Sequence, residues 1–187
     1  MTALALARAA PVPLIIDTDL GFDVDDVGAI AVANYLADRG ECEILAITHN
    51  TAFYEGIGGV DTIVNWYGRH GALELGAYTG PWGSAGGQDR YTTAIEADWP
   101  APVRNYNDTQ SAVAAYAAAL GRAANRSVVV ASIGELTNLR DALAALPELF
   151  AQKVRAIYYM DGPYNFGCGD SAGSGWSPWL GSTEDCD

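Results

Sequence analysis

Five carboxylates crowd a short stretch near the start of the chain, DTDLGFDVDD at residues 17–26. The apolar run VPLII precedes it and the helix-like run VGAIAVANYL follows it, which predicts a strand, a turn and a helix. The carboxylates would then lie at the carboxyl end of a strand, where open α/β sheets bind ligands. Like charges at this spacing repel one another unless a cation lies among them. The oxygen ligands suit a hard divalent cation, so the stretch predicts a calcium or magnesium site.

Helix capping is the competing explanation for these acids. Asp favours helix N-caps, and a carboxylate in the first turn is stabilised by the helix dipole. That effect accounts for one or two of the acids but not for five, because the dipole acts only over the first turn. We therefore interpret the stretch as functional.

Charge and composition narrow the class of protein. The chain has 187 residues, is half hydrophobic, and carries 10 Lys and Arg against 23 Asp and Glu, a net charge of −13. This length and hydrophobicity predict one globular domain over residues 1–187, with residues 1–11 flexible. The acidic balance argues against nucleic-acid and anionic-membrane partners, which need Lys and Arg. No apolar run is long enough for a membrane span.

Cysteine usage gives a weak indication of compartment. Cys42, Cys168 and Cys186 form no close-spaced metal pattern, so free thiols in a reducing compartment are the default interpretation. A Cys168–Cys186 disulfide is the alternative. The Ala-rich start lacks the basic residues of a signal peptide, which favours the cytoplasm without excluding secretion.

The remaining pattern alternates between strands and helices. Strands are expected at 12–16, 42–48, 73–78, 127–133 and 154–160, and helices at 27–36, 60–68, 111–124 and 136–146. Residues 79–107 are expected to form a long surface loop, and the polar segment 162–187 an irregular tail. Alternation of this kind predicts an α/β fold with a mostly parallel, doubly wound, Rossmann-like sheet flanked by helices. The pattern breaks off after 160, so the sheet is expected to be incomplete at the C-terminus.

Three stretches resemble the inosine/uridine-preferring nucleoside hydrolase family, the nucleoside N-ribohydrolases. The first is the aspartate stretch at 17–26, which is similar to the family's N-terminal fingerprint. The second, ASIGELTNL at 131–139, is similar to its Gly-x-Leu-Thr-Asn signature, and the third is the strand KVRAIYYMDG at 153–162. The resemblance covers most of this chain but only the N-terminal part of a usual family member.

The resemblance implies a calcium-dependent hydrolase that cleaves the bond between ribose and base. Asp19 matches the aspartate that contacts calcium and accepts a proton from the attacking water. Asp26 matches a calcium ligand, and the backbone carbonyl of Ile133 matches another. Asp25 matches the residue that binds ribose hydroxyls, and Asn50 matches a polar position near the ribose. Carboxylates beside a ribosyl cation would stabilise the charge that develops there.

Two departures from the family put turnover in question. Family members carry a Glu-x-Asn pair after the third stretch, where this chain has NFGCG at 165–169. They also draw a further calcium-binding Asp and a neighbouring His from a C-terminal region that has no counterpart here. Asn165, Asp170 or Glu184 could compensate, and the spacing selects none of them. A homo-oligomer could also complete the site.

Two other functions compete with nucleoside hydrolysis. A relative that binds calcium or a nucleoside without turnover is the first. The second is a phosphatase, because the run IIDTD at 15–19 looks like the start of a haloacid-dehalogenase-type enzyme with Asp17 as nucleophile and Asp19 as acid/base. Gly21 stands where that family has Thr or Val, which disfavours the phosphatase. The choice between purine and pyrimidine is left open.

Overall fold

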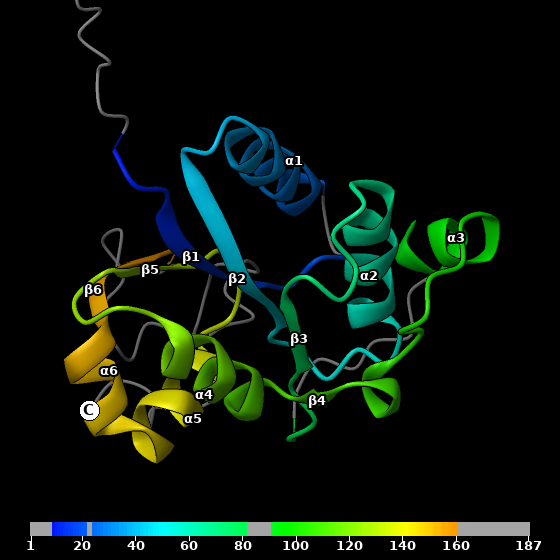
Figure 1. Ribbon diagram of the computed structural model, residues 1–187. Helices are drawn as coiled ribbons and strands as arrows, with labels where there is room; N and C mark the ends of the chain where they lie inside the picture. The colour runs from blue at the N-terminus through cyan, green and yellow to red at the C-terminus, as the bar shows by residue number, and fades with distance from the viewer. Residues whose placement is uncertain (1–8, 22–23, 82–90, 161–187) are drawn as a thin grey trace, which may run out of the picture.

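The computed structural model describes residues 9–21, 24–81 and 91–160. Within these residues it forms a six-stranded parallel sheet in the order β4-β3-β2-β1-β5-β6 (Figure 1). The strands are β1 (Val12–Thr18), β2 (Cys42–His49), β3 (Glu74–Ala77), β4 (Gln110–Ser111), β5 (Val128–Ser132) and β6 (Val154–Tyr159). This confirms the predicted α/β class with a parallel sheet. The tail at 162–187 lies outside the described residues.

Helices cover both faces of the sheet (Figure 1). They are α1 (Asp25–Asp38), α2 (Gly56–Trp66), α3 (Tyr91–Asp98), α4 (Ala112–Arg122), α5 (Thr137–Ala145) and α6 (Pro147–Lys153), with a 3₁₀ turn at Tyr106–Asp108. One core packs α1 and α2 against one face, and a second packs α4, α5 and α6 against the other. No described helix is both long enough and apolar enough to span a lipid bilayer.

The central strand β1 supplies side chains to both cores. Ile15 belongs to the core under α4, α5 and α6, and Ile16 belongs to the core under α1 and α2. Successive side chains of a strand point to opposite faces, and both faces of a parallel sheet are covered. This is why β1 is a continuous apolar run rather than an alternating one.

The region 79–107, predicted to be a surface loop, contains the helix α3. Thr92 and Glu96 are buried on its inner face, one turn apart. The helix is short and these two buried residues are polar. It therefore lacks the apolar residues at helical spacing by which a helix is detected in a sequence. The prediction of a loop throughout this region was wrong for these residues.

The second helix, α2, begins four residues before the predicted Val60. Gly56, Gly58 and Gly59 occupy its first turn and are poor helix formers, which concealed the true start. A Cβ on Gly59 would lie 2.6 Å from Cγ2 of Thr92, so glycine allows α3 to approach closely. Packing between the two helices overrides the local propensity here.

Candidate active site

The candidate site lies where the order of the strands reverses. β1 is flanked by β2 on one side and β5 on the other, and the carboxyl ends of all three meet at one edge of the sheet (Figure 1). Ligands of open α/β sheets bind at such a reversal. Asp17 pairs with Thr48 on β2 and with Ser132 on β5, so these residues share that edge.

Asp17 is a buried acceptor at the centre of this edge. Its side chain is fully buried and accepts hydrogen bonds from Thr48 Oγ1 at 2.5 Å, Asn138 Nδ2 at 2.9 Å and Ser132 Oγ at 3.4 Å. The pKa of Asp17 is raised from 3.8 to about 6, because the effect of burial exceeds the opposing effect of these hydrogen bonds and of nearby Asn50. These donors, which come from β2, β5 and α5, thus hold the carboxyl in place.

The turn between β5 and α5 is tied to the end of β2 by two side chains. Nδ2 of Asn138 also lies 3.0 Å from the carbonyl oxygen of His49. The hydroxyl of Thr137 donates to the carbonyl of Asn50. Thr137 and Asn138 belong to the GELTN stretch at 134–138.

Asp19 and Asn50 meet at Gly134. A Cβ built on Gly134 would lie 2.6 Å from the backbone nitrogen of Asp19, 2.7 Å from its Oδ1 and 2.8 Å from Nδ2 of Asn50. Both side chains are buried. The Asn50 amide makes no hydrogen bond of good geometry within the described residues. Glycine is required at this point, because any side chain would displace the Asp19 carboxylate or the Asn50 amide.

The two acids at the start of α1 have different surroundings. Asp26 is buried and accepts a hydrogen bond from the hydroxyl of Thr18. Asp25, the first residue of the helix, is exposed. Asp26 therefore faces the sheet edge that carries Asp19, whereas Asp25 faces solvent.

Ile133 follows β5 directly and its backbone nitrogen donates to the Asp17 carbonyl at 2.7 Å. This bond continues the pairing of β1 with β5 up to the Gly134 contact. Over the described ranges, however, no three His, Cys, Asp or Glu side chains gather closely enough to hold a metal ion. The fingerprint residue Asp23 lies outside those ranges.

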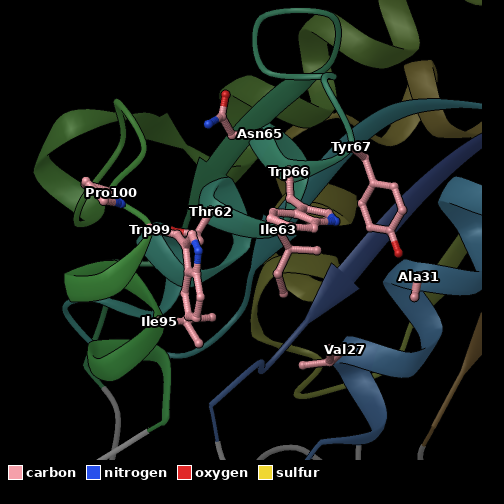
Figure 2. Close-up of a pocket in the computed structure, with 10 residues that line it drawn as sticks. All are labelled: Val27, Ala31, Thr62, Ile63, Asn65, Trp66, Tyr67, Ile95, Trp99 and Pro100. Atoms are coloured by element: carbon pink, nitrogen blue, oxygen red, sulfur yellow. The ribbon is translucent and has the colours of Figure 1, made fainter.

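A separate apolar hollow of about 470 Å³ lies between α1, α2 and α3 (Figure 2). Its lining contains Ile63 and Trp66 of α2 with Ile95 of α3 and Trp99 directly after it, and none of the predicted site residues. Of the residues that line this hollow, Val27 is the nearest in sequence to the acid stretch at 17–26. The chemistry-bearing side chains therefore belong to the sheet edge and not to this hollow.

Sequence reasoning missed the hydrogen-bonding roles of Thr48, Ser132 and Asn138 around Asp17. Each donor comes from a separate part of the chain, so no local spacing connects them. The available signal was the polar residues that end each buried strand, Thr48 and His49 in β2 and Ser132 in β5. His49, the last residue of β2, is also fully buried.

Several solved structures share the fold. The type III effector protein XopQ, determined in complex with adenosine diphosphate ribose, is 15% identical with a TM-score of 0.66, over 83% of this chain and 46% of its own. A plant nucleoside hydrolase is 20% identical with a TM-score of 0.62, over 81% and 48%. A purine-preferring ribonucleoside hydrolase from Gardnerella vaginalis is 23% identical with a TM-score of 0.55, over 80% and 48%.

The chain thus spans about half the length of the solved structures that it matches. Comparison with curated proteins gave no match. A sequence model of one family, described as inosine-uridine preferring nucleoside hydrolase, matches residues 14–174. That match includes the aspartate stretch and the GELTN stretch, which the structure brings together at Gly134. The chain belongs to the inosine-uridine preferring nucleoside hydrolase family.

Proposed function

We propose that this protein hydrolyses the N-glycosidic bond of ribonucleosides to ribose and free base, with calcium as cofactor. The observation that carries the proposal is the contact of Asp19, Asn50 and Gly134, which joins the two family stretches at one edge of the sheet. Membership in the family supports the reaction.

The donors at this edge suit calcium in their chemistry. Asp19 and Asp26 offer buried carboxylate oxygens, and buried carboxylates need a cation or hydrogen bonds to stay charged. Calcium takes about 6–8 oxygen ligands and accepts carboxylates and backbone carbonyls alike. Asp19, Asp26 and the carbonyl of Ile133 would hold the ion, and the remaining ligands would come from substrate, water or other residues.

The chain's own residues would divide the remaining work. A bound calcium ion lowers the pKa of a coordinated water molecule. Asp19 would accept the proton of the attacking water, and its carboxylate would stabilise the ribosyl cation as the base departs. Asp25, exposed at the start of α1, and the buried amide of Asn50 would bind ribose hydroxyls.

Ribose release from inosine and from uridine, measured with calcium and with a chelator, tests this function. We expect calcium-dependent release by the wild-type chain and its loss in Asp19→Asn, because the amide cannot accept the proton of water. Asp26→Asn should raise the calcium dissociation constant about tenfold or more, since it removes a charged ligand. The matched control is Asp98→Asn, an exposed acid at the end of α3.

Unchanged calcium affinity in Asp26→Asn would overturn the ligand assignment. Calcium binding without ribose release would point to the second candidate, a relative that binds but does not turn over.

A further inference from the structure

His49 lies at the centre of the candidate site and has no role in the proposed reaction. It is the last residue of β2, and its side chain is fully buried. Its Nε2 lies 3.1 Å from the carbonyl oxygen of Leu20, and its Nδ1 lies 3.2 Å from the carbonyl oxygen of Thr51. The ring therefore spans from the turn after β1 to the turn after β2.

Both of these partners are carbonyl acceptors, which favours a ring with a hydrogen on each nitrogen. A carbonyl oxygen can only accept a hydrogen bond, so a ring nitrogen that binds one must carry a hydrogen. A neutral imidazole has one N–H and one lone pair, and it would turn that lone pair toward a buried carbonyl. Only the imidazolium donates to both Leu20 and Thr51.

The surrounding charges are mixed but mainly acidic. The elements with most contacts to β2 are β1, β3, α1, α2 and α4. Their titratable side chains, with those of the described residues in the two bridged turns, are Asp17, Asp19, Asp25, Asp26, Tyr35, Asp38, Tyr54, Glu55, Asp61, Glu74, Tyr116 and Arg122. Arg122 is itself paired with Glu74, at 2.6 Å. Burial, the N-terminal end of α2 and a calcium ion bound at Asp19 and Asp26 would act against a positive charge on the ring. The two carbonyl oxygens, and the carboxylates in the calcium-free chain, favour it.

The ring also fits a slot that only glycine leaves open. A Cβ on Gly56, the first residue of α2, would lie 2.2 Å from both Cε1 and Nε2 of His49 and 2.8 Å from Nδ1. The absence of a side chain at Gly56 therefore lets α2 start against the ring. Because the slot fixes the ring plane, it also fixes the direction of both N–H bonds.

We propose that His49 is a positioning residue, held as an imidazolium, that ties the turn after Asp19 to the turn after Asn50. The tie sets the distance between the carboxylate proposed to receive the water proton and the amide proposed to bind ribose. Its role in turnover rests on the proposed function, but the state of the ring does not.

The state of the ring is measured on the wild-type chain by nitrogen-15 NMR of the imidazole groups. The sequence has two histidines, so the spectrum contains two rings, and His70→Gln assigns them. We expect both His49 nitrogens to carry hydrogens at pH about 7.5, one unit above the ordinary histidine pKa of about 6.5. A His49 ring with one unprotonated nitrogen at that pH would overturn the inference.

The tie itself is followed through the amide signals of Gly21 and Ala52, which share peptide groups with the two accepting carbonyls. On further raising the pH, both signals should shift together as the His49 ring loses its proton, and His49→Gln should abolish that shared pH profile. Gly56→Ala should displace both signals, because its Cβ would meet the ring. Gly28→Ala, a helical glycine with nothing within 4 Å of its Cβ, is the matched control and should displace neither.

Kinetics separate positioning from plain stability. In folded Gly56→Ala we expect kcat to fall about tenfold with KM changed less than about twofold, and in Gly28→Ala neither to change. A doubly protonated His49 in a wild-type chain that releases no ribose would leave the inference standing and defeat the proposed function. Ribose release by a chain whose His49 ring is neutral would support the proposed function and overturn the inference about His49.

Discussion

At the scale of single residues, two aspartates of one stretch have different surroundings. Asp17 is enclosed by donors from Thr48, Ser132 and Asn138, so its carboxyl holds strands together. Asp19, two residues on, lies beyond the strand against Gly134 and Asn50, where no side chain separates it from the amide. Asp17 thus has a structural role and Asp19 a proposed catalytic one, because only Asp19 lies beyond the last hydrogen-bonded residue of β1.

Replacement of Asn138 tests the structural task. Asn138→Ala removes the donor to Oδ1 of Asp17 and to the His49 carbonyl, both of which are buried. We expect the free energy of unfolding to fall by about 2 kcal/mol, since hydrogen bonds to charged groups contribute more than neutral ones. Urea unfolding measures the loss. Asn65→Ala, at an exposed position of α2, is the control, and equal losses in the two variants would contradict this role.

At the scale of secondary structure elements, α3 is held on α2 through a buried carboxyl. Oε1 of Glu96 is buried without a hydrogen-bond partner among the described residues. A Cβ on Gly58 would lie 2.2 Å from that oxygen and 2.3 Å from the Arg104 carbonyl, so only glycine permits this packing. The pKa of Glu96 is raised from 4.5 to about 7, chiefly by burial and also by the charges of Glu55 and Asp108. The charge of Arg104 and the backbone hydrogen bond of Gly59 oppose this rise.

This contact makes the stability of the fold depend on pH. Because the folded pKa of Glu96 lies above the unfolded value, the protonated carboxyl stabilises the fold below pH about 4.5. That contribution is lost as the pH rises to about 7. Thermal unfolding of the wild type against Glu96→Gln should therefore show a difference in Tm that changes across this window and levels off above it.

The comparison with Glu96→Gln is needed because Asp17, with a pKa of about 6, contributes in the same direction over an overlapping window. Glu148→Gln, at an exposed position of α6, is the control and should follow the wild type. A difference in Tm between wild type and Glu96→Gln that stays constant from pH 4 to 8 would contradict the assignment.

At the scale of the whole molecule, one strand joins two separate cores. Ile15 and Ile16 are neighbours in β1, and each is buried in the core on its own face of the sheet. The candidate site lies at the end of this same strand. Loosening either core should therefore disturb the strand that carries Asp17 and leads into Asp19.

Truncation of either isoleucine tests this arrangement. We expect Ile15→Ala and Ile16→Ala each to lower the free energy of unfolding by about 3 kcal/mol, through lost apolar burial and the cavity that remains. Val32→Ala, at a position 58% exposed on α1, should change it by less than about 0.5 kcal/mol. Chemical denaturation measures all three. If only one isoleucine proved sensitive, the two cores would not share the strand's stability equally.

The sequence by itself determined the strand and helix alternation, the parallel sheet and the location of the acid stretch after β1. Apolar runs bounded by turn residues specify buried strands locally. The family stretches at 17–26 and 131–139 are continuous in the sequence, so they could be recognised without the structure. The sequence did not reveal α3 or the start of α2. In these segments Thr92, Glu96 and three glycines stand where a helix is recognised by apolar residues.

Only the tertiary structure decided which polar residues meet. The donors to Asp17 come from positions 31, 115 and 121 residues away in the chain, and no local pattern encodes such a pairing. The glycines at 56, 58 and 134 likewise make sense only once His49, Glu96 and Asp19 are placed against them. Local sequence fixes backbone preference over a few residues, whereas contact between distant side chains depends on how the strands are ordered in the sheet.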